Sequence, residues 1–268
     1  MGERLAGKHA VVVGAGQTAG ETIGNGRATA ILFAREGARV LLIDRDATSL
    51  AETARLVERD APGHAETLVA DIGDDAGCRA IADVANDTFA GAVDVLHNNV
   101  GIGAGDAGPL SLDPDVWDRI LDTNLKAMWL TCKHVVPLMR ARQTGAIVNI
   151  SSVAAVAGVG NLTAYKISKA GVNALTQSLA VTNARYGIRV NAIMPGLIDT
   201  PMAVDAAARA RGVTRAEMAD ARARMVPLGH QGSAWDIAHA ALYLASDDAA
   251  FVTGVVLPVD GGQSAQVG

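Results

Sequence analysis

The feature of this sequence that most restricts its fold is a regular alternation of short apolar runs with longer segments of helical period. The seven runs are rich in Val, Ile and Leu and lie at 9–14, 39–44, 66–71, 93–98, 146–151, 188–193 and 255–260. Strands buried on both faces of a parallel sheet have this character. Between them, helices are predicted at 25–36, 47–60, 75–90, 115–140, 163–186 and 234–246. The order predicts an α/β fold: a doubly wound parallel sheet of seven strands with helices on both faces.

No repeat, low-complexity tract or Pro/Ser-rich linker divides the chain, so one domain over residues 1–268 is expected. The first predicted helix carries one apolar stripe, formed by Ala28, Ile31 and Leu32, with a polar edge at Arg35. Segment 199–232 interrupts the alternation with a helical insertion rich in Ala and Arg. Because it follows a late strand, we expect it to form a substrate lid over the crevice at the carboxyl ends of the strands. A solvated helical hairpin is the open alternative.

Composition excludes several classes of function. The chain has 23 Lys and Arg against 28 Asp and Glu, a net charge of −5, so no nucleic-acid partner is expected. Its two cysteines, Cys78 and Cys132, belong to no CxxC pair or Cys/His cluster, which predicts neither a metal site nor a disulfide. The start has no signal-peptide run, and no apolar stretch approaches the roughly 18 residues of a membrane span. We therefore expect a cytoplasmic protein without a membrane partner.

A glycine-rich turn follows the first apolar run directly. Its glycines are Gly14, Gly16, Gly20, Gly24 and Gly26. Backbone N–H groups at a helix N-terminus bind a pyrophosphate, and glycine lets the backbone approach it closely. Each glycine inside a helix costs about 1 kcal/mol, so the helix is predicted to begin near Asn25, after a lengthened loop over 15–23. The predicted pyrophosphate site consists of Gly14, Gly16, Gly24, Asn25 and Gly26.

The second apolar run ends in an acidic residue, Asp44, which lies 20 residues after Gly24. A carboxylate at this position accepts hydrogen bonds from the adenosine ribose and repels a 2′-phosphate. Arg45 follows at once and could hold that phosphate instead. NAD is therefore the predicted cofactor, with NADP as the less favoured alternative.

Three residues form a candidate catalytic group. Tyr165 and Lys169 lie four residues apart on one face of the predicted helix at 163–186. Ser152 lies 13 residues before Tyr165, at the edge where open α/β sheets place their ligands. A tyrosine with a pKa of about 10 is a poor base at neutral pH, and a nearby ammonium group favours the phenolate. The Ser152 hydroxyl can stabilise charge on a substrate oxygen.

With these motifs the sequence resembles the short-chain dehydrogenase/reductase family, in its single-domain form, from about residue 7 to 262. The likeness rests on HNNVG at 97–101, NISS at 149–152, YKISK at 165–169 and PGLIDT at 195–200. It implies a Rossmann fold and an NAD(P)-dependent oxidoreductase that interconverts a secondary alcohol and a ketone by hydride transfer. It also implies that Lys169 binds the nicotinamide ribose and that Asn124 supports a water linking Lys169 to solvent.

The resemblance implies further cofactor contacts. They are Asp71 and Ile72 at the adenine, Asn98, Val100 and Gly101 after the fourth run, and Pro195, Gly196, Ile198 and Thr200 on the nicotinamide side, besides Tyr165 and Lys169. Two features depart from the family pattern: the glycine turn is six residues longer, and Val100 stands where the family has Ala.

Family members usually form tetramers through long helices and carboxyl-terminal strands. The apolar residues Trp117, Ile120, Leu121, Leu125, Met128, Trp129 and Val136 on one predicted helix agree with a homotetramer.

The substrate class is read from two segments expected to line the pocket, 101–110 and 153–162, which are small and apolar. They favour an uncharged alicyclic, aryl or steroid-like alcohol, unless the arginines of the lid point inward and select an acidic substrate. Two other functions remain open. A Rossmann methyltransferase would not need Ser152, Tyr165 and Lys169, and a catalytically silent, cofactor-sensing protein could lose them.

Overall fold

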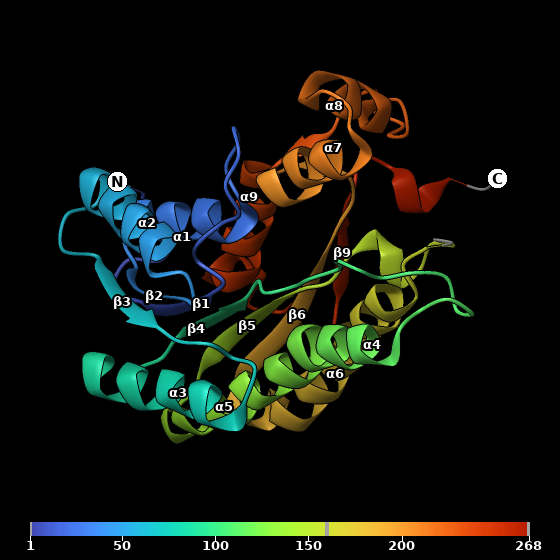
Figure 1. Ribbon diagram of the computed structural model, residues 1–268. Helices are drawn as coiled ribbons and strands as arrows, with labels where there is room; N and C mark the ends of the chain where they lie inside the picture. Colours follow the sequence, from blue (N-terminus) through green and yellow to red (C-terminus); the bar gives the residue numbers. More distant parts are fainter. Residues whose placement is uncertain (1, 159–160, 267–268) are drawn as a thin grey trace.

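Seven parallel strands form one sheet in the computed structural model, which describes residues 2–158 and 161–266 (Figure 1). The strands are β1 (His9–Val13), β2 (Arg39–Asp44), β3 (Ala65–Val69), β4 (Val95–Asn98), β5 (Gly145–Ile150), β6 (Ile188–Pro195) and β9 (Val256–Val259). Their order is β3-β2-β1-β4-β5-β6-β9, all in parallel register. The order reverses beside β1, which pairs with both β2 and β4. The predicted doubly wound Rossmann sheet is confirmed.

Two layers of helices cover the sheet. One face carries α1 (Asn25–Arg35), α2 (Ala47–Asp60) and α9 (Ala234–Ala245); the other carries α3 (Asp75–Phe89), α4 (Pro114–Leu121), α5 (Ala127–Arg142) and α6 (Thr163–Asn183) (Figure 1). Each layer encloses its own hydrophobic core against alternate side chains of the strands. Single-turn helices lie at Val153–Ala155, Ala184–Tyr186, Asp247–Ala249 and Gln263–Ala265.

Two predictions of burial were wrong. The outermost strands β3 and β9 are largely exposed or half-buried, because each has a neighbour on one side only within the described chain. Helix α1 is the opposite case, since Gly26 through Ala34 are all buried instead of forming one apolar stripe. It packs against α2, α9 and the sheet, so that several faces of the helix are covered.

The predicted helix over 115–140 is interrupted. A π-helical turn, Asp122–Lys126, separates α4 from α5 and contains the fully buried Asn124. π-Turns inside helices are rare and frequently occur at functional sites.

The predicted insertion at 199–232 is helical. It leaves the sheet through β7 (Ile198–Asp199), continues through a π-turn (Pro201–Asp205), α7 (Ala206–Arg211) and α8 (Arg215–Ala223), and returns through β8 (Gly232–Ser233). β7 and β8 pair in parallel and close the excursion at its base. Figure 1 shows α7 and α8 beyond the end of the sheet, on the side of α9.

In residues 2–158 and 161–266, no helix combines the length and apolar character that crossing a membrane requires. The same residues contain no group of three His, Cys, Asp or Glu side chains arranged to hold a metal ion. Cys78 and Cys132 are free and buried, and burial raises the pKa of the Cys132 thiol to about 12.

Candidate active site

The carboxyl ends of the strands bring the predicted site residues to one edge of the sheet. Gly14 and Gly16 follow β1, Asp44 and Arg45 end and follow β2, Asp71 and Ile72 follow β3, and Asn98, Val100 and Gly101 end and follow β4. Ser152 follows β5, and Pro195, Gly196, Ile198 and Thr200 end and follow β6. The start of α1 and the helices that carry Asn124, Tyr165 and Lys169 border this edge.

Ser152 and Tyr165 meet at this edge. The Ser152 hydroxyl accepts a hydrogen bond from the N–H of Ala154 at 3.2 Å, which fixes the serine at the start of a short helical turn. Burial raises the pKa of the Tyr165 phenol, and a hydrogen bond with Ser152 acts in the opposite direction. The pKa of Tyr165 is therefore raised by burial in this structure, and not lowered as the sequence predicted.

Lys169 is one helical turn beyond Tyr165 and almost fully buried. Its Nζ donates to the carbonyl of Ile150 at 2.8 Å and lies 5.8 Å from the centre of the Tyr165 ring. Burial lowers the pKa of Lys169 to about 8, so that the ammonium form still predominates at pH 7. A positive charge beside the phenol ring is thus built into α6.

Asn124 connects the π-turn to a neighbouring loop and to α6. Its Oδ1 accepts from the N–H of Ile102 at 2.7 Å, and its Nδ2 donates to the Ile102 carbonyl at 2.9 Å and to Ser168 Oγ at 3.0 Å. The side-chain amide therefore holds a loop that packs on Tyr165. Asn124 and Lys169 make separate hydrogen bonds, with Lys169 bonded to Ile150.

The glycine turn packs tightly against the first helix. A Cβ on Gly26 would lie 1.9 Å from the Gly14 carbonyl oxygen, so only glycine allows α1 to approach this closely. Gly14 has a φ of +81°, which glycine adopts without strain. Helix α1 begins at Asn25 as predicted, behind Gly24, and no side chain caps its first turn. Its free N–H groups suit an anion.

The lengthened loop over 15–23 is fixed by side chains that the sequence did not single out. Gln17 Oε1 accepts from the N–H of Gly24 at 2.8 Å, and Gln17 Nε2 donates to the Thr22 carbonyl at 3.2 Å. The Gln17 N–H in turn donates to Ser49 Oγ at 2.8 Å. One glutamine thus closes the extra residues into a compact turn and docks them on α2.

Asp44 lies beside this loop. Its carboxylate accepts from the N–H of Gly16 at 2.9 Å and from that of Asp46 at 3.0 Å. Arg45 is exposed and forms no ion pair within the described residues. Arg27 of α1 is buried nearby and bonds Thr53 and Ser49, and this burial lowers its pKa. Nothing in the sequence pattern distinguishes Arg27 from an arginine on the solvated face of a helix.

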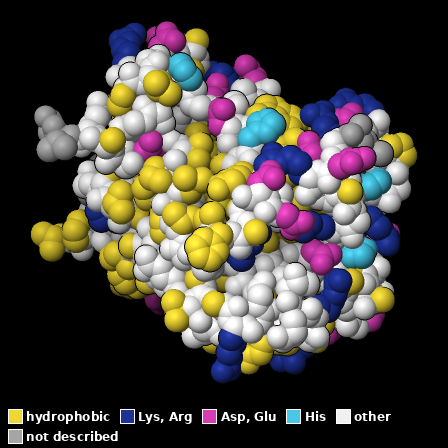
Figure 2. Space-filling model, turned by 180° about the vertical axis from the view of Figure 1, so that it is seen from behind, with side chains coloured by type: hydrophobic (Ala, Val, Ile, Leu, Met, Phe, Trp, Pro, Cys, Tyr) yellow, Lys and Arg dark blue, Asp and Glu magenta, His cyan; other side chains and the backbone are white. Residues whose placement is uncertain are grey.

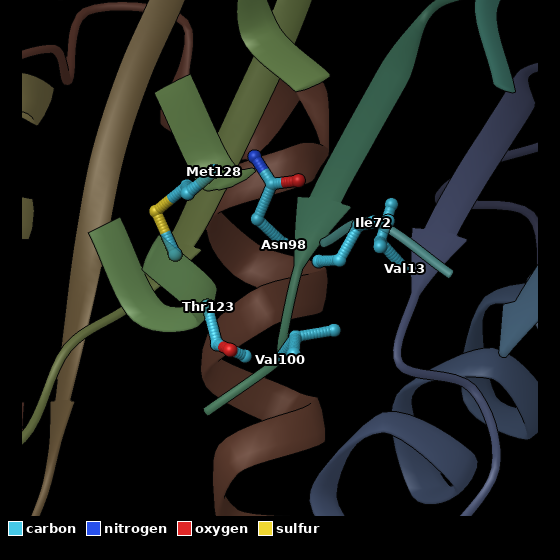
Figure 3. A pocket seen from close by; sticks show the side chains of 6 residues that line it. All are labelled: Val13, Ile72, Asn98, Val100, Thr123 and Met128. Atoms are coloured by element: carbon cyan, nitrogen blue, oxygen red, sulfur yellow. The ribbon is translucent and has the colours of Figure 1, made fainter. Parts of the chain in front are cut away.

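A small cavity lies beneath the ends of β1 and β4. It measures about 10 Å³ and is lined by Val13, Ile72, Asn98, Val100, Thr123 and Met128 (Figure 3). Its volume is that of about one water molecule. The Asn98 side chain donates to Asn149 Oδ1 at 2.9 Å and is buried within the sheet layer. Asn98 therefore joins β4 to β5 through its side chain. After β3, Asp71 Oδ1 accepts a hydrogen bond from the N–H of Gly73 at 2.9 Å.

The loop after β6 is held by the carboxyl-terminal segment. Gln263 Oε1 accepts from the N–H of Leu197 at 2.8 Å, and a Cβ on Gly196 would lie 2.6 Å from Asp260 Cα. Thr200 caps the next turn by accepting from the N–H of Ala203 at 3.3 Å. The predicted nicotinamide-side segment is thus supported by residues more than sixty positions further along the chain.

The insertion touches the lengthened loop through a charged group that we name the Arg215 cluster: Arg215, Asp199, Asp205 and Glu21. Arg215 lies 2.5 Å from Asp199, 3.5 Å from Asp205 and 3.6 Å from Glu21. The N–H of Glu21 also donates to Asp205 Oδ1 at 3.1 Å. Arg222 bonds Gln231 at 2.7 Å, whereas Arg209, Arg211 and Arg224 are exposed. The insertion is therefore not a freely solvated hairpin.

The edge has the features that a dinucleotide requires. Its glycine turn leaves no room for a Cβ at Gly26, the first turn of α1 is uncapped, and a carboxylate ends β2. Beside it, a hydroxyl, a phenol and a buried ammonium group form a set that can exchange a proton with a substrate oxygen. Two residues of the predicted pocket segment 153–162, Val159 and Gly160, lie outside the described residues.

Known proteins resemble this chain along its length. A protein-family model described as Enoyl-(Acyl carrier protein) reductase matches residues 19–264. The cis-4-hydroxycyclohexanecarboxylate dehydrogenase of Sinomonas cyclohexanicum is 39% identical over 265 residues, covering 99% of this chain and 100% of that protein. The crystal structure of levodione reductase matches with a TM-score of 0.92 at 34% identity and 100% coverage of both chains. Carveol dehydrogenase from Mycobacterium avium, solved in complex with NAD, has a TM-score of 0.89 at 31% identity, with coverage of 98% and 100%.

Proposed function

The chain belongs to the short-chain dehydrogenase/reductase family, and from this membership we propose that it is an NAD-dependent dehydrogenase of apolar, ring-bearing secondary alcohols. It is an oxidoreductase that acts on an alcohol or ketone and uses a nicotinamide dinucleotide. The observation that carries the finer proposal is the position of Tyr165, whose pKa is influenced by Ser152 and whose ring centre lies 5.8 Å from the Lys169 ammonium group.

In the proposed mechanism, Tyr165 takes the proton of the alcohol, or returns one to the ketone oxygen. Ser152 holds the same oxygen and stabilises the charge that develops there. Lys169 favours the phenolate through its positive charge, against the burial that raises the pKa of Tyr165. When bound, the dinucleotide supplies the hydride acceptor or donor. Asn124 acts indirectly, by fixing the loop at Ile102.

The proposed cofactor site uses the free N–H groups at the start of α1 for the pyrophosphate and Asp44 for the ribose. Its further members are Gly14, Gly16, Gly24, Asn25, Gly26, Arg45, Asp71, Ile72, Asn98, Val100, Gly101, Pro195, Gly196, Ile198 and Thr200. The exposure of Arg45 leaves Asp44 as the charged side chain bonded into the glycine turn, which supports NAD over NADP.

An uncharged substrate is supported by the surroundings of the edge. Val156 lies four residues after Ser152, and Met202 lies two residues after Thr200. Both of these apolar residues are more than half exposed. Of the lid arginines, Arg215 and Arg222 bond groups of the protein itself. The relative from Sinomonas is named for a ring alcohol that carries a carboxylate, so a charged ring belongs in the same test.

The test is a panel of secondary alcohols assayed with NAD⁺ and with NADP⁺: cyclohexanol, 1-phenylethanol, a 3-hydroxysteroid and cis-4-hydroxycyclohexanecarboxylate. Formation of reduced nicotinamide with the first three supports the proposal. If cis-4-hydroxycyclohexanecarboxylate alone were turned over, the proposed uncharged substrate would be wrong and an acidic substrate would take its place. Binding of NADH without turnover of any alcohol or ketone would favour the cofactor-sensing alternative.

Removal of the phenol hydroxyl tests the proton-transfer role. Tyr165→Phe should lower kcat by at least about 10²-fold, because general acid–base groups contribute this much or more. NADH binding, followed by fluorescence, should persist. Tyr243→Phe is the matched control, since Tyr243 lies on α9 and is partly exposed. Retained turnover in a folded Tyr165→Phe protein would refute the assignment.

A further inference from the structure

Helix α6 carries Tyr165 in its first turn but has no capping side chain of its own. The residue that precedes the helix is Leu162, and it makes no side-chain bond to the helix. The first N–H groups of a helix have no partner inside the helix, and an uncapped first turn tends to open. A catalytic tyrosine at this place needs an external support.

One dipeptide of a distant loop supplies that support. Asp106 Oδ2 accepts from the N–H of Tyr165 at 2.8 Å, and its Oδ1 accepts from the N–H of Ala164 at 3.2 Å. The Ala107 carbonyl accepts from the Thr163 hydroxyl at 2.7 Å and from the Thr163 N–H at 3.3 Å. The three N–H groups that α6 leaves unsatisfied are therefore all bonded by residues 106–107.

The same loop, residues 101–107, also lies against the phenol ring. A Cβ on Gly103 would be 3.4 Å from the ring of Tyr165. The loop is fixed on its other side, because Asn124 bonds both backbone groups of Ile102, and Arg119 donates to the Ala104 carbonyl at 2.6 Å. The backbone and the ring of Tyr165 are thus both positioned by one loop that is anchored at three points.

We propose that Asp106 is a positioning residue for the reaction, acting through Tyr165, by capping α6 from the 101–107 loop. The proposal rests on the proposed function, in which Tyr165 transfers the proton. A charged carboxylate at a helix N-terminus is favourable, and its two oxygens hold the backbone from which the phenol projects. Displacements of about 1 Å at a reacting group can cost about 10²-fold in rate.

The test compares Asp106→Ala and Asp106→Asn with Asp74→Ala. Asp74 also caps a helix, because it directly precedes α3 and accepts from the N–H of Gly77 at 2.8 Å. We expect Asp106→Ala to lower kcat by about 10- to 100-fold and to leave the KM for NAD⁺ within about twofold. Asp106→Asn keeps one acceptor oxygen and should be intermediate. Asp74→Ala should lower the melting temperature by about as much as Asp106→Ala does, and should leave kcat unchanged.

A double substitution separates positioning of Tyr165 from other effects. In a Tyr165→Phe background, Asp106→Ala should cause no further loss of residual activity, because the group that it positions is gone. Multiplicative losses would overturn the proposal. An Asp106→Ala protein that melts earlier but retains kcat, as Asp74→Ala is expected to do, would equally reduce Asp106 to a structural cap.

Amide hydrogen exchange gives a readout that does not depend on turnover. With NADH bound, Asp106→Ala should raise exchange at Ala164 and Tyr165 but not in the middle of α6, and Asp74→Ala should change only α3. Unchanged exchange at Tyr165 overturns the proposal. If the wild type turned over no alcohol or ketone, the proposed function would fail, and the exchange at Tyr165 would still decide whether Asp106 holds this turn.

Discussion

At the scale of single residues, Asp44 is the side chain that we propose distinguishes the two nicotinamide dinucleotides. Its carboxylate is bonded to the N–H of Gly16, and no arginine among residues 2–158 and 161–266 forms an ion pair with it. We expect kcat/KM to favour NAD⁺, and Asp44→Ala to reduce that preference by about tenfold, the equivalent of one hydrogen bond to a charged group. Asp46→Ala, which removes the neighbouring cap of α2, is the control. A wild type that prefers NADP⁺ would make Arg45 the deciding residue.

His97 is a second residue with a measurable consequence. It is fully buried on β4 beside Phe33, and neither ring nitrogen has a hydrogen-bond partner in the part of the chain that the structure describes. Burial lowers its pKa to about 3. Below pH 6.5 the unfolded chain binds a proton that the folded chain does not, so stability falls as the pH falls from about 6.5 toward about 3. Between pH 7.5 and 5 this amounts to roughly 2 kcal/mol.

Denaturant unfolding at several pH values checks this expectation. His97→Leu should remove most of the loss between pH 6.5 and 5, and His239→Leu, which changes an exposed histidine, should keep it. If the free energy of unfolding of His97→Leu fell with pH as steeply as that of the wild type, the acid sensitivity would belong to other groups.

At the scale of elements, the sequence predicted the seven strands of the sheet and the helices that cover it, with α4 and α5 taken as one helix. These elements were predictable because apolar runs and helical periods reflect burial. It also predicted the start of α1 at Asn25, since glycines are poor helix formers. It did not predict the π-turn at Asn124, because the residues of 115–140 are typical of one continuous helix. The contacts of Asp106, Gln17 and Gln263 were also not predictable, because each joins residues that only the tertiary fold brings together.

The Arg215 cluster leads to a prediction about two elements, α8 and the lengthened loop. Arg215→Ala removes the cation that faces Asp199, Asp205 and Glu21, and Asp205 is nearly buried. We expect NADH to dissociate about fivefold faster, the equivalent of about 1 kcal/mol for a partly exposed ion pair. Stopped-flow fluorescence measures this rate. Arg211→Ala, which changes an exposed arginine of α7, should leave it unchanged, and equal rates in all three proteins would contradict the prediction.

At the scale of the whole molecule, two apolar surfaces remain without a partner in the described chain. A groove of about 350 Å³ between α4, α5 and α6 is lined by Leu121, Leu125, Trp129 and Leu175, together with the charged residues Asp122 and Lys126. Figure 2 shows a second gathering of hydrophobic side chains, on the side of the molecule where β9 forms the edge of the sheet, whereas charged side chains predominate on the opposite side. Of the apolar residues predicted for an interface, Ile120, Met128 and Val136 belong to the core instead.

These surfaces support the prediction of a homotetramer. Light scattering after gel filtration should give about four times 27.4 kDa. Trp129→Glu places a charge in the groove and should yield a smaller assembly, whereas Val69→Glu, on the exposed edge strand β3, should not. A monomeric wild type at micromolar concentration would contradict this prediction and leave the proton-transfer proposal untouched.

The Arg215 cluster also has a consequence for steady-state kinetics. Because it joins the insertion to the loop at the proposed pyrophosphate site, we expect the two elements to separate before a product dinucleotide leaves. Turnover then waits on departure of the nucleotide, and alcohols of different intrinsic reactivity share one maximal velocity. A substrate deuterated at the carbinol carbon should show almost no primary isotope effect on kcat in the wild type. In Arg215→Ala, where departure is faster, the isotope effect should emerge as the hydride step becomes rate-limiting.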